Sequence, residues 1–236
     1  MNILLLGDIV GRTGRKAVKD QLPVLIEEYR VDFVIANGEN AAGGFGLTEQ
    51  LADDLFSYGI NVITMGNHTW SNSSIFSFID NEKRLIRPLN YNKDTPGKGW
   101  TVLKYGNTNI AVINLIGQIF MNGNNSPFDE FDKNILEIKE KSDIIIIDFH
   151  AEATGEKLAF ANYIDGQVSA VVGTHTHVQT SDEMILPNGT AYITDLGMCG
   201  AIDSILGMNK KNIIERFRTG IPERYIVKEG AYKIEG

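Results

Sequence analysis

The stretch VVGTHTHVQT, residues 171–180, joins an apolar run directly to two histidines, His175 and His177, that lie one threonine apart. The chain has only four histidines. The other two are His68, in the string MGNHTW, and His150, in the string IIIIDFH, and each also follows a hydrophobic run. Because short apolar runs rich in β-branched residues indicate strands buried on both faces, we expect every histidine to lie at the end of a strand.

Apolar runs of this kind recur along the chain, with helical or turn segments between them. The predicted strands are ILLL (3–6), FVIA (33–36), VITM (62–65), IAVINLI (110–116), DIIIIDF (143–149), VSAVV (168–172) and AYIT (191–194). Strand and helix therefore alternate for most of the chain. This alternation predicts a layered α/β fold or an α-β-β-α sandwich.

The segments between the strands carry helix signals. A helical pattern around Leu22 is expected to break at Pro23, because proline suits the first turn of a new helix better than a helix interior. Thr48 and Thr154 can each cap the start of a later helix.

Two segments depart from the alternation. In WTVLKYGNTNIAVINLI, residues 100–116, two strand-like runs flank a turn at Gly106 and Asn107, which predicts an antiparallel hairpin. The last residues, RYIVKEGAYKIEG at 224–236, predict another short hairpin.

Length and composition limit the class of protein. With 236 residues, of which 43% are hydrophobic and 22% charged, the chain can bury one sizeable core, and we expect a single domain over residues 1–236. No run approaches the roughly 20 apolar residues of a membrane span, and the N-terminus lacks the pattern of a signal peptide, so a cytosolic protein is expected.

The net charge limits the ligands that the protein is expected to bind, and the single cysteine has no expected chemical role. The net charge is −8 and no Lys/Arg-rich run occurs, so no binding track for long nucleic acids or anionic lipid is expected, whereas a small ligand or a short end is compatible. Cys199 cannot form an internal disulfide, and among small neighbours it is expected to be a packed apolar residue without a chemical role.

Polar side chains follow the predicted strands. They are Asp8, Glu39 with Asn40, Asn67 with His68, His150, and His175 with His177. Ligands of open α/β sheets bind outside the carboxyl ends of the strands, so these groups are expected at one rim. Oxygen and nitrogen donors without a thiolate suit manganese, iron or zinc. Two such ions, about 3.5 to 4 Å apart, are a common device for polarising a phosphate and activating a water.

Each of these residues also has a plainer explanation. Asp8 could be a turn or cap residue, Asn40 could form a tight turn with Gly38, and His150 could be a half-buried histidine with one backbone partner. The spacing of His175 and His177 is by itself only a modest metal signal. The coincidence of all of them at strand ends favours a shared site.

The motifs GD, GEN, GNH, a single H and G-x-H-x-H follow one another in this order, and in this the chain resembles the calcineurin-like metallophosphoesterase superfamily. The longer strings FVIANGENAAGGFGLT, VITMGNHTW, DFHAEATGEK and DGQVSAVVGTHTHVQTSD resemble its YmdB-like branch, bacterial proteins associated with hydrolysis of 2′,3′-cyclic nucleotides. The resemblance implies a four-layer α-β-β-α sandwich with mixed sheets and a site for two divalent metal ions, iron or manganese before zinc.

The resemblance also implies which residues hold the metals. The first ion would be held by Asp8, Asn40 and His177, the second by Asn67, His150 and His175, with Glu39 bridging both. The superfamily usually has histidine two residues after the first aspartate, where this chain has Val10. Asn40, next to the bridging glutamate, is the natural substitute for that ligand.

His68 is the histidine left without a metal, and its chemistry suits a general acid. In hydrolysis of a 2′,3′-cyclic phosphate, a metal-bridging hydroxide would attack phosphorus and an imidazolium at His68 would protonate the departing ribose oxygen. The alternative role is a hydrogen bond to the phosphate. The loop AAGGFG, residues 41–46, could bring backbone amides to the phosphate or act as a lid.

The expected function is therefore a dinuclear metal-dependent phosphodiesterase acting on small cyclic nucleotides. The alternatives are a phosphomonoesterase or nuclease using the same site, and a regulatory protein that binds a nucleotide through its metals with little turnover. The apolar residues Phe45, Phe120, Met121 and Phe128 could serve a pocket, the core or an interface, and a homo-oligomer is compatible with them.

Overall fold

The strands form three sheets in this computed structural model, which describes residues 1–121 and 125–236. The first sheet is parallel, in the order β1 (Ile3–Leu6), β3 (Phe33–Asn37), β4 (Val62–Thr64) and β5 (Leu85–Ile86). The second is mixed, in the order β10 (Met184–Ile185), β11 (Ala191–Ile193), β9 (Ala170–Thr174), β8 (Ile144–His150), β7 (Thr108–Ile116) and β6 (Trp100–Tyr105). A small third sheet joins β13 (Tyr232–Lys233), β12 (Met198–Ala201) and β2 (Asp8–Ile9).

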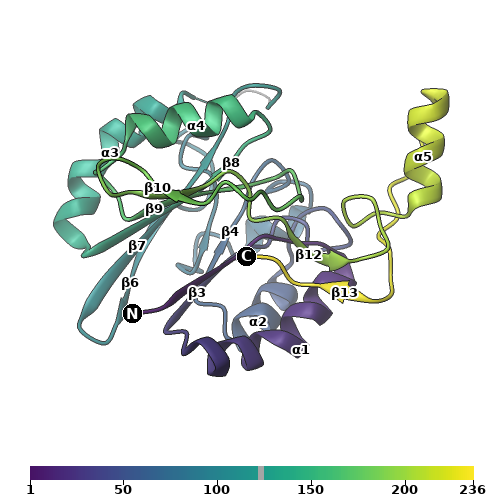
Figure 1. The fold of residues 1–236 in the computed structure, drawn as a ribbon, viewed down its shortest axis with the longest axis horizontal. Coiled ribbons are helices and arrows are strands. Elements are labelled where there is room, and N and C mark those ends of the chain that lie inside the picture. Colours follow the sequence, from purple (N-terminus) through teal and green to yellow (C-terminus); the bar gives the residue numbers. More distant parts are fainter. Residues whose placement is uncertain (122–124) are drawn as a thin grey trace.

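Helices cover the outer faces of the two large sheets (Figure 1). Those on the first sheet are α1 (Gly11–Tyr29) and α2 (Glu49–Ser57), and those on the second are α3 (Pro127–Lys141) and α4 (Thr154–Tyr163). A short 3₁₀ helix, η1, spans Ser73–Ser77, and α5 (Lys210–Thr219) stands apart from the layers. The predicted four-layer α-β-β-α sandwich with mixed sheets is confirmed.

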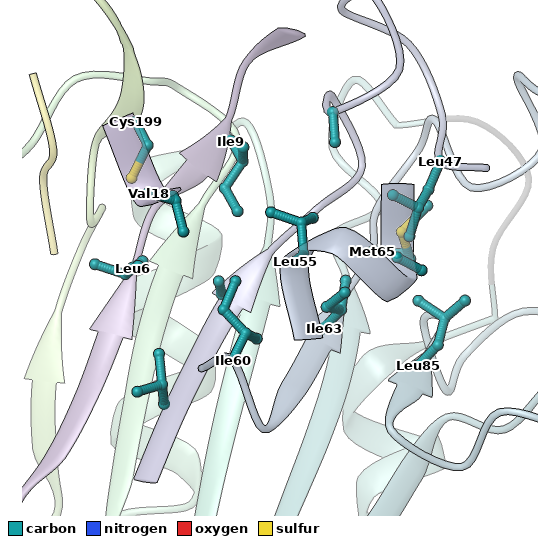
Figure 2. Packing of buried hydrophobic residues seen from close by; sticks show 14 of the residues in the cluster. Leu6, Ile9, Val18, Leu47, Leu55, Ile60, Ile63, Met65, Leu85 and Cys199 are labelled. Carbon is teal, nitrogen blue, oxygen red and sulfur yellow. The ribbon is translucent and has the colours of Figure 1, made fainter. Parts of the chain in front are cut away.

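Alternation along each buried strand creates the layers. In β3, Phe33 and Ile35 face the second sheet and pack with Ile110, Val112 and Ile146. Their neighbours in the strand, Val34 and Ala36, belong instead to the core shared with α1 and α2, part of which Figure 2 shows. Because successive side chains of a strand point to opposite faces, a continuous apolar run is what a strand needs when both faces are covered.

Most of the predicted elements are found. All seven predicted strands occur, the hairpin of β6 and β7 turns at Gly106 and Asn107, and the hydroxyl of Thr48 accepts a hydrogen bond from the Leu51 amide at the start of α2. Cys199 is buried in the core shared with α1 and α2 (Figure 2), as expected of a packed residue. Burial raises the pKa of its thiol to about 12.

Three local predictions were wrong. Helix α1 continues through Pro23, because Pro23 and Lys19, whose carbonyl loses its hydrogen bond there, lie on the exposed side where water can replace it. Helix α4 begins at Thr154, but Ala153 is the capping residue and no side chain caps it. The last residues do not form a hairpin of their own, because β13 pairs with β12 instead.

Within the described residues, no helix has both the length and the apolar character needed to cross a bilayer.

Candidate metal centre

The predicted site residues lie around the carboxyl ends of the parallel strands. Asp8 begins β2, Glu39 and Asn40 follow β3, Asn67 and His68 follow β4, His150 ends β8, and His175 and His177 follow β9. Residues as far as 167 positions apart in the sequence are in contact here, as Asp8 and His175 are. The structure therefore brings the predicted residues of both sheets to one rim, where they form two contacting groups.

The first group consists of Asp8, Asn40 and His177. The amide nitrogen of Asn40 lies 3.1 Å from Asp8 Oδ1 and 3.2 Å from His177 Nε2, and His177 Nε2 lies 3.4 Å from the same Asp8 oxygen. The other oxygen of Asp8 accepts the backbone N–H of His175 at 3.0 Å. Asp8 is fully buried, so its charge depends on these contacts.

The second group surrounds His150. Its Nε2 atom lies 2.9 Å from Glu39 Oε1, 3.0 Å from Asn67 Oδ1 and 3.1 Å from His175 Nδ1. The ligand atoms of Glu39, His150 and His175 all lie within 4.8 Å of one another. One ring nitrogen carries at most one proton, so a single proton cannot serve three acceptors, whereas a cation among these lone pairs can contact all of them.

A buried relay fixes the orientation of the His150 ring. The hydroxyl of Thr174 donates to Asp148 Oδ1 at 2.7 Å, so its oxygen accepts the Nδ1–H of His150, 2.9 Å away. Asp148 also accepts hydrogen bonds from Thr64 and Asn37, and burial raises its pKa to about 6. Nδ1 of His150 is therefore the nitrogen that bonds outward, and Nε2 is the ring atom that faces the second group, where a bound cation would replace its proton.

The other two imidazoles are held in the same manner. His177 donates its Nδ1–H to the carbonyl of Leu206 at 3.1 Å, and His175 places Nε2 3.0 Å from Glu152 Oε2. Each ring therefore bonds outward through one nitrogen and presents the other to the candidate centre. This outer hydrogen bond is the usual arrangement of histidines that ligate metals.

The charges of the two groups are coupled. Burial raises the pKa of Asp8 and Glu39, but the imidazoles of His177 and His150 beside them outweigh burial, and both pKa values lie below their ordinary range. Burial lowers the pKa of His150, but Glu39 beside it outweighs that effect and raises the pKa to about 9. Burial and the positive charge of His150 lower the pKa of His175 to about 3. The carboxylates are therefore ionised and His175 is neutral near pH 7.

Gly66 makes room for the second group. A Cβ atom at this position would lie 2.4 Å from His150 Nε2 and 2.5 Å from Glu39 Oε2. The contact of Glu39 with His150 therefore requires glycine here. The carbonyl of Gly66 is also fixed, because it accepts hydrogen bonds from Tyr91 at 2.9 Å and Thr69 at 2.6 Å.

A buried ion pair holds the loop after β9. Lys157 and Asp195 lie 2.9 Å apart with almost no exposure, and they also bond to the Thr174 carbonyl and the Thr176 amide. The flanking His175 and His177 have positive φ angles of 103° and 62°, which non-glycine residues adopt at a cost of about 1–3 kcal/mol each. The ion pair therefore stabilises a backbone that is strained at the two histidines.

His68 lies beside the centre and is joined to it through its backbone. Its N–H donates to Glu39 Oε2 at 2.8 Å, and its ring lies 3.2 Å from the Ser71 hydroxyl through Nδ1. The ring also meets the edge of Phe45, with 4.9 Å between centroids. Burial lowers the pKa of His68, because the half-buried ring loses hydration of its charged form.

Comparison with known proteins assigns the family. The family described as YmdB-like protein matches residues 4–236. The chain belongs to the YmdB-like family. It is 52% identical to the 2′,3′-cyclic-nucleotide 2′-phosphodiesterase of Bacillus subtilis over 236 residues, which cover all of this chain and 89% of that protein. A Mycoplasma pneumoniae structure described as a novel phosphatase is 38% identical, with a TM-score of 0.92, covering 98% of this chain and 84% of that one.

A more distant structure shares the fold of the YmdB-like chain. A Staphylococcus aureus protein assigned as a 5′-nucleotidase matches with a TM-score of 0.61 at 15% identity, covering 99% of this chain and 54% of that one. This likeness shows the fold, a sandwich of the metallophosphoesterase type, and the 52% identity to a phosphodiesterase shows that the protein is an enzyme.

Sequence reasoning missed the outer partners of this YmdB-like site. Asp148 carried a signal, because an acid within the apolar run IIIIDFH must be buried and therefore needs partners. Glu152 had a weaker signal, two residues after a strand-end histidine. The Leu206 carbonyl and the ion pair of Lys157 with Asp195 join distant segments, and no local pattern indicates them.

Two features of the family motif are explained by the structure. Val10, at the position where the superfamily usually has histidine, is fully buried in an apolar cluster with Met198 and Met208, so it cannot serve as a ligand. The AAGGFG loop does not offer its amides to a phosphate as suggested, because those of residues 42–45 donate to carbonyls of residues 40–46. The loop instead carries Phe45 to His68.

Proposed function

We propose that this protein is a dinuclear metal-dependent phosphodiesterase that hydrolyses small cyclic nucleotides of the 2′,3′-cyclic type. The observation that carries the proposal is the arrangement of three imidazoles, His150, His175 and His177. Each is bonded outward through one ring nitrogen and turns the other either to Asp8 or to the cluster that contains Glu39. The name of the Bacillus subtilis relative supports the substrate class.

The donor set fits two divalent transition metal ions. One ion would be held by Asp8, Asn40 and His177, the other by Asn67, His150 and His175, with Glu39 shared between them. The proximity of the residues within each group supports this division, and Asn40 would turn its Oδ1 atom inward in place of its amide nitrogen. Oxygen and imidazole donors without a thiolate accept iron, manganese and zinc, and iron or manganese is proposed. Two carboxamides among the ligands leave only two negative charges, which keeps such ions strongly Lewis-acidic.

The chemistry that these ions supply when bound is polarisation of the phosphate and activation of the attacking water. His68 acts from the side of the departing ribose oxygen as a proton donor. Its backbone bond to Glu39 ties the ring to the centre, and its lowered pKa makes the imidazolium a stronger acid. The contact of Ser71 with Nδ1 leaves Nε2 as the atom that carries the transferred proton.

The test is a substrate panel with the purified, metal-loaded chain. Rates would be measured side by side on 2′,3′-cyclic AMP, p-nitrophenyl phosphate and single-stranded RNA. The proposal predicts the highest kcat/KM on the cyclic diester. Two bound metals without cleavage of the cyclic diester would overturn it.

A second candidate is a phosphomonoesterase on the same site, and the description of the Mycoplasma pneumoniae structure as a phosphatase favours it. A higher kcat/KM on p-nitrophenyl phosphate than on 2′,3′-cyclic AMP would select this candidate. A regulatory binding protein is distinguished by His68→Gln. An enzyme loses about 10²- to 10⁴-fold in turnover with its nucleotide affinity kept, whereas a binding protein has no turnover to lose.

A further inference from the structure

A hollow of about 550 Å³ opens directly beside the candidate centre. At its inner end it is lined by three site residues, Asn67, His68 and His175. The rest of its lining is mainly aromatic and apolar, formed by Trp70, Tyr91, Ile116, Phe120 and Met121. Its volume lies within the range of about 300–1,000 Å³ that is usual for small-molecule sites.

The charges of the lining indicate what kind of group it accepts. Among the residues that the structure describes, the lining contains no lysine or arginine, and its one acidic residue, Glu152, is already paired with His175. A second phosphate would therefore meet a negative charge and no counter-charge. A flat, neutral, aromatic group fits this lining, because it can stack on the rings and leave no buried charge unpaired.

Phe120 differs from the other aromatic residues of the lining in its exposure and its backbone conformation. Its side chain is 87% exposed, so it contributes little to the core, and its backbone has φ of 62°, which is unfavourable for a residue with a bulky side chain. A strained, exposed aromatic at the edge of a site is typical of a residue kept for ligand contact. By contrast, Tyr91 is fixed, because its hydroxyl donates to the Gly66 carbonyl and its ring lies 5.8 Å from that of Trp70.

A larger cavity, of about 1270 Å³, lies between the segment 87–102 and α3. Its lining shares Tyr91 with the smaller hollow but includes none of the candidate metal ligands. A group joined to a phosphate at the centre therefore enters the smaller hollow first.

We propose that this hollow is a nucleoside subsite, in which the base of the cyclic nucleotide stacks on Phe120 and packs against the wall formed by Tyr91 and Trp70. The proposal rests on the proposed function and adds the residues that select a nucleoside. Because its lining outside the metal groups offers few side chains to read the edge of a base, the subsite distinguishes bases by stacking area. Adenine and guanine are therefore accepted alike, and pyrimidines more weakly.

The test compares a substrate with and without a base. Kinetic constants would be measured on 2′,3′-cyclic AMP and on 1-O-methylribose 2,3-cyclic phosphate, for the parent chain and for Phe120→Ala. Loss of one base–aromatic stack is expected to raise KM for 2′,3′-cyclic AMP about 10-fold, with kcat and the constants for the base-free substrate little changed. Binding of adenosine, followed by calorimetry, should weaken by a similar factor.

Two variants control the experiment. Phe120→Tyr keeps the ring and should behave as the parent. Phe217→Ala removes a phenylalanine of α5 that is similarly exposed, at 84%, and should leave the kinetic constants for both substrates unchanged. Equal use of both substrates by the parent, or equal effects of Phe120→Ala on both, would overturn the subsite and leave the proposed function standing. If the parent cleaved neither substrate, both the subsite and the proposed function would be overturned.

Discussion

The two sheets contribute different chemistry to the centre, and they hold it in different ways. Segments of the first sheet and β2 supply the carboxylates and carboxamides, and their carboxylates are oriented by backbone N–H groups, that of His175 at Asp8 and that of His68 at Glu39. Segments of the second sheet supply three imidazoles, and these are oriented mainly by side chains such as Thr174 and Glu152.

The two sides of the centre should therefore respond to different kinds of substitution. The oxygen side of the centre depends on the path of the backbone, so it is vulnerable to changes in backbone and glycine positions. The imidazole side depends on hydrogen bonds of its side chains, so it can be weakened stepwise. Neither side alone has balanced charge, because the buried carboxylates and imidazoles neutralise each other across the sheets.

Gly66→Ala should have the largest effect, because it removes space where the two sides meet. The added Cβ atom would overlap His150 and Glu39, so both must shift. We expect kcat/KM to fall by more than the roughly 100-fold that loss of an outer partner costs. Gly155→Ala is the matched control, since no atom of the described residues comes within 4 Å of a Cβ atom built there. An active Gly66→Ala variant would contradict the close approach.

Lys157→Met should lower the free energy of unfolding by about 3 kcal/mol, because it leaves Asp195 buried without its partner. Urea unfolding measures the change. Lys133→Met removes the exposed cation of a pair with Glu130, and should lower the free energy of unfolding much less than Lys157→Met does. Equal effects of the two substitutions would mean that the buried pair does not hold the loop of His175 and His177.

Glu152→Gln tests the imidazole side more gently. The half-exposed carboxylate of Glu152 orients His175, so its loss should lower the affinity for one metal ion about 10-fold. Titration with the metal in the presence of a competing chelator measures this affinity. The other metal should be bound as in the parent. Unchanged affinity for both metal ions would mean that Glu152 does not orient His175.

Ser71→Asp should have the smallest effect, a shift in pH dependence. Since burial lowers the pKa of His68, the fraction carrying the acid proton declines as pH rises through a value below the ordinary one. A carboxylate near Nδ1 favours the charged ring, so it should move the alkaline limb of kcat/KM upward by about one pH unit. Ser71→Asn, which adds no charge, should leave that limb in place, and an unmoved limb in Ser71→Asp would argue against His68 as the acid.

The sequence predicted the strands and the site residues that follow them, but not the partners that hold the imidazoles. Strands buried on both faces require continuous apolar runs, so β3, β4, β8 and β9 and the residues that end them could be read directly. The partners of the imidazoles come from residues far apart in the chain, as with His177 and Leu206, and depend on packing that local pattern does not encode. The continuation of α1 through Pro23 was missed for a related reason, because it depends on which helix face is exposed.

The most direct test of the account is the metal content of the parent, His175→Ala and His177→Ala, measured by elemental analysis on folded, untreated protein. The contacts put His175 with His150 and His177 with Asp8. We therefore predict two metals per chain in the parent and one in each variant, with spectra of the retained ion that differ between the variants. Loss of both metals in both variants, or one metal in the parent, would contradict the division of the centre.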